Sequence, residues 1–155
     1  MAPRQHMRKM KVGKVTFTEA YKAVHEYRQK FPEKAVTFYA QNYPAMGWAV
    51  FMAGGSCPVI PCTDKAFLKD AAAMEVEETN TDEYKKMVKS DIGSIIYSKS
   101  GTEIPVQLSS GKYALKYIHP ASGKIETINK SLKINDLYNL KVPDKKEGIY
   151  WFHKL

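Results

Sequence analysis

The feature that most constrains this chain is a change of hydrophobic period near residue 91. Beyond that residue, apolar and polar side chains alternate in short runs, and turn-forming Ser-Gly, Pro-Ala-Ser-Gly, Asn-Asp and Pro-Asp sequences separate the runs. A period of two places every second side chain on the same face of a strand. About five to seven such runs in succession are typical of a compact antiparallel β-sandwich, which we predict over residues 91–155.

The first half of the chain shows helical spacing instead. Residues 17–31 carry apolar side chains at helical intervals, and Thr16 and Glu19 have the spacing of a capping box. Residues 45–53 are nearly all apolar and end at a Gly-Gly pair, and residues 65–74 form an amphipathic pattern behind a capping Thr or Asp. We therefore predict three helices before the alternating region.

Two short β-branched or aromatic runs lie between these helices, AVTFYA at residues 35–40 and CPVI at residues 57–60. Their lack of alternation suits strands that are buried on both faces. The order helix, strand, helix, strand, helix is typical of a parallel α/β sheet. The predicted fold class is α+β, and the predicted organisation is a basic N-terminal arm (1–15), an α/β segment (16–78), an acidic connector (79–90) and an antiparallel β-sandwich (91–155).

The formal net charge of +8 is concentrated at the N-terminus, where the first 30 residues hold eight Lys or Arg and two Glu. Such an arm can contact phosphates or anionic surfaces. The sequence contains no aromatic RNA-binding signature and no zinc-finger spacing, so we do not expect a nucleic-acid partner. A solvated terminus is the simplest interpretation, and a free-standing interaction domain that binds an acidic partner through this arm is the alternative.

The composition, 44% hydrophobic and 26% charged, is typical of a soluble globular protein. No apolar run approaches the roughly 20 residues that span a bilayer, so we expect no membrane partner. The basic start is not followed by an apolar segment, so this chain shows no signal peptide.

No metal or cofactor site is predicted. Cys57 and Cys62 form a C-x4-C pair without a second pair, which does not match a zinc site. We expect two buried free thiols, and a disulfide across a tight loop stays open as an alternative. The acidic run at residues 75–83 lacks the spacing of an EF-hand, so it is interpreted as a solvated connector and not as a calcium site.

The tail of the chain carries a family resemblance, in residues 95–126 (IIYSKSGTEIPVQLSSGKYALKYIHPASGKIE) and 138–155 (YNLKVPDKKEGIYWFHKL). It resembles the C-terminal β-sandwich of apiosidase-like glycoside hydrolases. That family shows an aromatic, an acid or Asn, then Pro, Arg, Thr and Gly where this chain has residues 117–123, and it ends in an Asp-Trp-aliphatic run. Residues 35–74 are similar to the last two strands and helices of the (β/α)8 barrel that precedes the sandwich there.

The resemblance implies a C-terminal fragment of a polysaccharide-degrading glycoside hydrolase, periplasmic or secreted. A barrel needs about 250 residues, and two parallel strands would leave open edges, so we expect self-association or contact with the missing barrel portion. Glycosidases use two carboxylates roughly 5–10 Å apart, yet neither candidate strand ends in Asp or Glu. We therefore assign no catalytic residue and predict a non-catalytic accessory module that binds polysaccharide weakly.

Four residues are candidates for carbohydrate binding. Gln41, Asn42 and Tyr43 follow the first predicted strand, and the carboxyl ends of barrel strands face the active site. Amide and phenol groups can hydrogen-bond to sugar hydroxyls, whereas the simpler interpretation is that Asn42 caps the following helix. Trp151 alternates with Ile149 and His153 in the last strand, where it is either a stacking platform for a sugar or a domain-interface residue.

Overall fold

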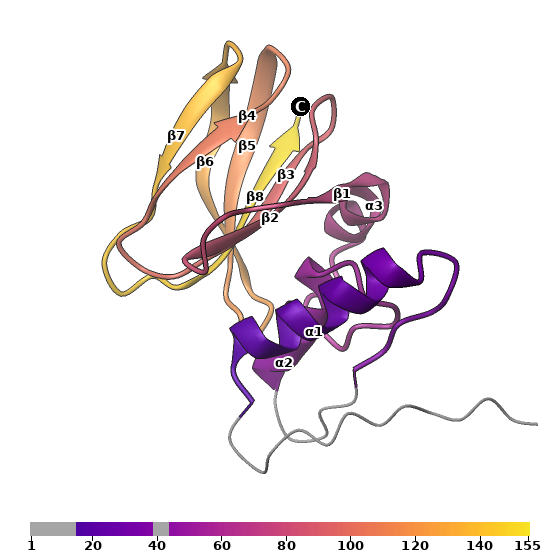
Figure 1. Cartoon of the computed structure of the whole chain (residues 1–155). Helices are drawn as coiled ribbons and strands as arrows, with labels where there is room; N and C mark the ends of the chain where they lie inside the picture. Colours follow the sequence, from indigo (N-terminus) through magenta and orange to yellow (C-terminus); the bar gives the residue numbers. More distant parts are fainter. Residues whose placement is uncertain (1–14, 39–43) are drawn as a thin grey trace, which may run out of the picture.

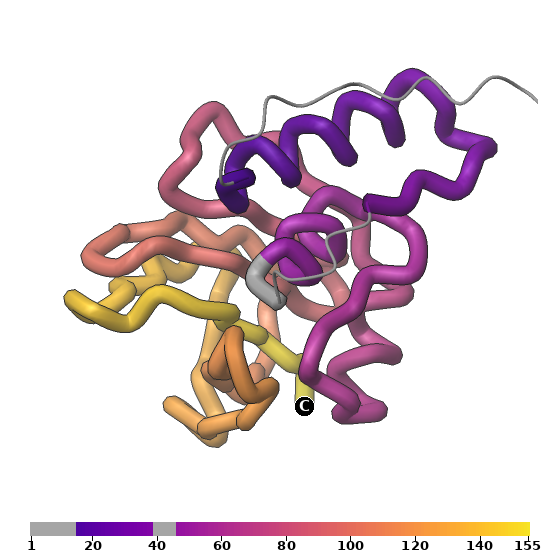
Figure 2. Tube along the Cα trace, turned by 90° about the horizontal axis from the view of Figure 1, so that it is seen from below, coloured from indigo at the N-terminus to yellow at the C-terminus, as the bar shows by residue number. Residues whose placement is uncertain are grey.

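The computed structural model describes residues 15–38 and 44–155 of the chain, apart from the side chains of residues 44 and 45. Within these ranges three helices come first and eight strands follow, which confirms the α+β class. Figures 1 and 2 show the helices gathered against one side of the β region. The helices are α1 (Phe17–Lys30), α2 (Pro44–Met52) and α3 (Lys65–Ala73).

The helices begin where the sequence predicts. Thr16 caps α1: its hydroxyl accepts from the backbone N–H of Glu19, whose carboxylate accepts from the backbone N–H of Thr16 at 2.9 Å. The side chain of Asp64 caps α3 by accepting from the N–H of Phe67. Each cap satisfies a backbone donor that has no partner inside the helix.

All strand pairs are antiparallel and form two sheets. The strands are β1 (Glu75–Glu77), β2 (Tyr84–Lys89), β3 (Gly93–Ser98), β4 (Glu103–Gln107), β5 (Gly111–Ile118), β6 (Ile125–Ile134), β7 (Leu137–Lys141) and β8 (Gly148–Lys154). The large sheet has the order β1-β2-β3-β8-β5-β6, and β4 pairs with β7 in a second, two-stranded sheet. The two sheets face one another, as a β-sandwich requires.

Both faces of the large sheet are covered, so the protein has three layers. Ile95 and Trp151 point toward the helices and belong to a core with α1, α2 and α3. Their neighbours Ile96 and Tyr150 point the other way, into a core shared with Ile104 of the small sheet. Strand alternation explains this division, because successive side chains leave a strand on opposite faces. Every residue of β3 is buried for the same reason.

The parallel strands expected between the helices are not formed in the described residues. Residues 35–38 and 57–60 have no ladder partner, while residues 39 and 40 lie outside the described part of the chain. Helices joined by irregular segments therefore replace the expected α/β layer. The open parallel edges on which we based self-association are consequently not seen in these segments.

Strands occupy the end of the predicted α/β segment (16–78) and much of the predicted acidic connector (79–90). Residues 75–77 form β1, which pairs with β2 from Glu75 opposite Val88 to Glu77 opposite Lys86. The β region thus begins about sixteen residues earlier than the change of period at residue 91 indicates. Residues 78–83 form the loop between the two strands.

The tip of the β5–β6 hairpin joins the sandwich to the helices. The indole Nε1 of Trp48, in α2, donates to the carbonyl oxygen of Pro120 at 2.9 Å. Gly123 at the same tip has φ +70°, and an added Cβ would come within 2.5 Å of the carbonyl oxygen of Pro61. The Pro-Ala-Ser-Gly turn therefore packs against the loop before α3.

None of the helices in the described residues is long and apolar enough to cross a membrane.

Candidate functional site

One side of α1 supplies half of a polar pocket. Tyr21, His25 and Gln29 are spaced four residues apart, so they lie one above the other on the same side of the helix, with Lys22 beside them. The Tyr21 and His25 rings stack with centroids 5.5 Å apart. Burial, and to a smaller extent the nearby Glu78 carboxylate, raise the pKa of the Tyr21 phenol to about 12. The Tyr21 hydroxyl therefore stays protonated and neutral at physiological pH.

The loop between β1 and β2 supplies the other half, and it is organised around the ammonium group of Lys85. Lys85 Nζ donates to the carbonyl oxygen of Thr81 at 2.6 Å and lies 3.4 Å from Thr79 Oγ1 and 3.5 Å from Asp82 Oδ1. It also lies 4.8 Å from the centre of the Tyr21 ring. The ammonium of Lys85 thus contacts three oxygen atoms of this acidic loop.

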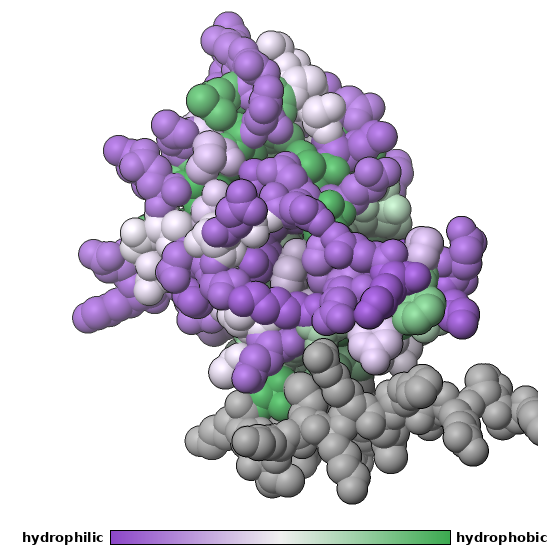
Figure 3. Space-filling view, viewed as in Figure 1, coloured by the Kyte–Doolittle hydropathy of each residue, from purple (hydrophilic) through white to green (hydrophobic). Residues whose placement is uncertain are grey.

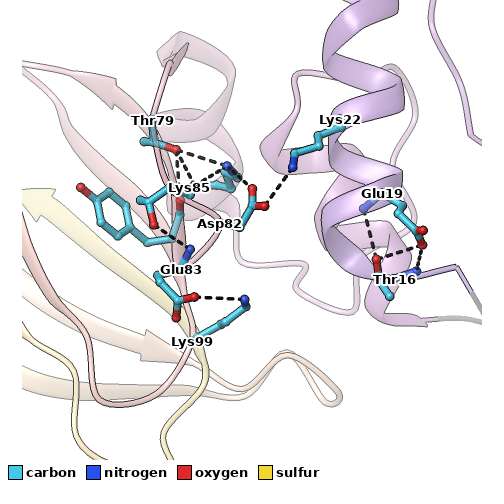
Figure 4. A network of polar contacts seen from close by, with 10 residues as sticks. Thr16, Glu19, Lys22, Thr79, Asp82, Glu83, Lys85 and Lys99 are labelled. Atoms are coloured by element: carbon cyan, nitrogen blue, oxygen red, sulfur yellow. Dashed lines mark hydrogen bonds and ion pairs between the residues drawn. The ribbon is translucent and has the colours of Figure 1, made fainter.

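Three side-chain contacts connect α1 to this loop. Lys22 Nζ donates to Asp82 Oδ2 at 2.9 Å (Figure 4). Further along the helix, the Gln29 amide donates to Glu78 Oε1, and His25 Nε2 lies 3.7 Å from the same oxygen. The ammonium of Lys22 lowers the pKa of Asp82 by hydrogen bonding to its carboxylate. Asp82 is consequently ionised at neutral pH.

Between α1 and the loop lies an open pocket of about 390 Å³. The face that carries α1 and the loop is mostly hydrophilic (Figure 3). The lining residues all have polar side chains: Tyr21, Lys22, His25, Gln29, Glu78, Thr79, Asn80, Thr81, Asp82 and Lys85. Asn80 is exposed, and its amide forms no hydrogen bond to the described residues. The pocket therefore offers both donors and acceptors to a polar ligand.

Of the four residues predicted from the sequence, Trp151 lies in the described part of the chain, and it does not line this pocket. Gln41, Asn42 and Tyr43 lie outside the described residues. Trp151 is fully buried, with its ring nearly perpendicular to that of Phe67 at 5.4 Å between centroids and the ammonium of Lys116 at 4.2 Å from the ring centre. Its indole therefore has no face open to a sugar, and it occupies the interface between sheet and helices that the sequence offered as the alternative.

Sequence reasoning missed the pocket because its two halves are far apart in the chain. Lys22 and Asp82 are 60 residues apart. Two local signals were present: the polar and aromatic side chains repeating every four residues on α1, and the basic residue Lys85 immediately after the acidic run. Neither signal indicates that the helix packs beside the loop, because that packing depends on the sheet.

A family model described as a domain of unknown function, DUF6298, matches residues 1–74. No curated protein matches the chain. A solved structure named "Glycoside hydrolase" is similar with a TM-score of 0.39 and 13% identity, over 51% of this chain and 19% of that structure. The chain thus spans about a fifth of that hydrolase, and a likeness this weak assigns neither fold nor activity.

Proposed function

We propose that this chain is a non-catalytic accessory module of a polysaccharide-degrading glycoside hydrolase and that it binds glycan weakly in the pocket between α1 and the β1–β2 loop. The parent enzyme belongs to the apiosidase-like family, by the resemblance of residues 95–126 and 138–155. A polymer-degrading enzyme meets its substrate outside the cytoplasm, so we place the protein in the periplasm or among secreted proteins.

The observation that carries this proposal is the lining of the pocket. Sugar hydroxyls both donate and accept hydrogen bonds, and they are recognised by planar polar side chains that do the same. Within the described part of the chain, the Asn80 amide, the Gln29 carbonyl oxygen and Glu78 Oε2 have no hydrogen-bond partner. These groups lie at an open pocket, so a saccharide unit can reach them from solvent.

The same geometry supports binding without hydrolysis. Glycoside hydrolysis needs a carboxylic acid that holds its proton near neutral pH, which requires a raised pKa. Asp82 has the opposite environment, because Lys22 lowers its pKa. Glu78, the other carboxylate in the pocket lining, accepts a hydrogen bond from Gln29. The pocket therefore has the components of a binding site and not those of an acid–base pair.

The test is affinity electrophoresis of the full chain through gels that contain cellulose derivatives, xylan, mannan or galactan, at low and high salt. We expect retention on at least one polymer that persists at high salt, since neutral hydrogen bonding is little screened. The Asn80→Ala variant should lose most of that retention. The matched control is Asn139→Ala, an exposed asparagine of β7 in the other sheet, which should behave like the parent protein.

Two outcomes would contradict the proposal. Retention only on acidic polymers and only at low salt would favour an interaction domain that uses the basic N-terminal arm, because electrostatic binding weakens steeply with salt. Equal loss of retention in Asn80→Ala and Asn139→Ala would show that the pocket is not the contact site.

A further inference from the structure

The cations that line the pocket are already neutralised by its own anions. With neutral histidine, the lining carries two positive groups, Lys22 and Lys85, and two negative groups, Glu78 and Asp82. Lys22 pairs with Asp82 at 2.9 Å, and Lys85 is directed at Thr81 and Asp82. Only 5% of the Lys85 side chain is exposed, so a ligand cannot reach its ammonium. The Lys22 ammonium is exposed, with 64% of its side chain accessible, but it already has a carboxylate partner, so an incoming anion would have to compete with Asp82 for it.

The most accessible charge at the rim is negative. The Glu78 side chain is 74% exposed, and its Oε1 faces Gln29 and His25 while Oε2 is left for solvent or ligand. A carboxylate acts as a hydrogen-bond acceptor, which suits a hydroxyl donor and repels a second carboxylate. An acidic ligand would lose its hydration without gaining a free cation.

We infer that the pocket selects uncharged saccharide units and rejects uronic acids, a specificity that rests on the proposed glycan binding. The selectivity comes from the Lys22–Asp82 ion pair together with the exposed carboxylate of Glu78. Neutral hexoses offer hydroxyl donors to Glu78 and both donors and acceptors to Asn80 and Gln29. A hexose oxidised at C6 presents a carboxylate to a lining with no uncompensated positive charge.

Matched ligand pairs test this selectivity directly. Cellohexaose, mannohexaose and galactohexaose are each compared with the same oligosaccharide oxidised at C6 to the uronate, by calorimetric titration into the full chain at pH 8. We expect at least one neutral ligand to bind and its oxidised form to bind roughly tenfold more weakly or worse, a difference of about 1.4 kcal/mol.

Two variants each give the lining a net positive charge by removing one carboxylate. Asp82→Asn releases Lys22 from its partner, and Glu78→Gln removes the exposed carboxylate while retaining its shape. In each variant the oxidised ligand should gain relative to the neutral one by roughly the same factor of ten. Glu78 is largely exposed, so its variant folds even if Asp82→Asn disturbs the loop around Lys85. Glu103→Gln, at an exposed carboxylate of β4, is the control and should leave the preference unchanged.

The outcomes separate the two claims. Equal or tighter binding of the oxidised form to the parent chain would overturn the charge selectivity and keep glycan binding. An unchanged preference in both Asp82→Asn and Glu78→Gln would also overturn it. Binding of neither form of any pair would overturn the proposed function, and the selectivity with it.

Discussion

Asp70 and Trp151 are joined by a hydrogen bond between α3 and the last strand, 2.9 Å from the indole Nε1 to Asp70 Oδ2. The two residues are 81 positions apart, and Trp151 is fully buried. The same carboxylate oxygen lies 2.7 Å from Nδ1 of His153. A buried carboxylate is costly unless it is paired, and the two ring nitrogens provide the pairing for Asp70. Through these two contacts the Asp70 side chain attaches α3 to the large sheet.

Replacing Asp70 by alanine should therefore destabilise the whole protein. The Trp151 N–H would be left buried without an acceptor, which costs about 1–3 kcal/mol. Urea unfolding followed by tryptophan fluorescence measures the loss. Glu103→Ala, at an exposed carboxylate of β4, should stay within about 0.5 kcal/mol of the parent protein. Equal midpoints for the two variants would contradict the role assigned to Asp70.

The parts of the fold that depend on local interactions could be predicted from the sequence. The capping box of Thr16 and Glu19 acts over three residues, and the helix starts where that pair indicates. The strands of the sandwich follow from a period of two, because the alternation of burial along Glu103–Gln107 is already visible in its alternation of side chains.

The strands predicted at residues 35–40 and 57–60 could not be judged from local sequence alone. Val36 lies in a run with strong strand character, but a strand exists only when a neighbour supplies a hydrogen-bonded ladder. Here its carbonyl accepts from the N–H of Ser56 at 2.7 Å, and its own N–H donates to the Ser56 hydroxyl at 3.2 Å. One residue twenty positions away satisfies the backbone, so no ladder forms in the described residues.

The acidic run was misjudged because its partners come from elsewhere in the chain. Counted locally, residues 75–83 carry five negative charges and suggest a solvated connector. In the fold, Lys86 pairs with Glu77, Lys22 with Asp82, and Lys99 with Glu83. Lys86 lies in β2 and Lys99 directly follows β3. The sequence of the run itself indicates neither the pairing of these strands nor the position of α1.

The ammonium of Lys85 should be the group that holds the β1–β2 loop in place. Lys85→Met keeps the buried stem of the side chain but removes the 2.6 Å hydrogen bond to Thr81 O, which then keeps only the 3.4 Å contact from the Thr79 hydroxyl. We expect a loss of about 1–3 kcal/mol in unfolding free energy and faster amide hydrogen exchange in the loop. Both are measured on the same sample, by urea titration and by exchange mass spectrometry.

The matched variant is Lys99→Met, since Lys99 also pairs with a loop carboxylate, Glu83, but its side chain is 41% exposed. An exposed ion pair contributes at most about 1 kcal/mol, so this variant should change stability little and leave loop exchange as it was. Loop protection that is the same in both variants would show that Lys85 does not organise the loop.

Tyr21 should make the protein sensitive to alkali. Its folded pKa is raised to about 12 from the ordinary value of 10, so the folded state holds the phenolic proton more tightly than the unfolded state does. The corresponding stability is complete below pH 10 and is lost as the pH rises toward 12, by roughly 3 kcal/mol at most. Urea unfolding at pH 8 and pH 11 measures the loss, and Tyr21→Phe should lose less between these two values. An identical decline in parent and variant would contradict the assignment.

The two cysteines should differ sharply in reactivity. Both are free thiols; Cys57 is exposed, contrary to the expectation that both are buried, while Cys62 is buried. Burial raises the pKa of the Cys62 thiol, which reduces the thiolate that reacts. With Ellman's reagent at pH 8 we expect the Cys57 thiol to react at once. The Cys62 thiol should react at least roughly tenfold more slowly, because the reagent reaches it only when the surrounding structure opens locally. Cys57→Ser should abolish the fast phase alone, whereas a chain with no titratable thiol after unfolding would instead contain the disulfide that the C-x4-C spacing leaves open.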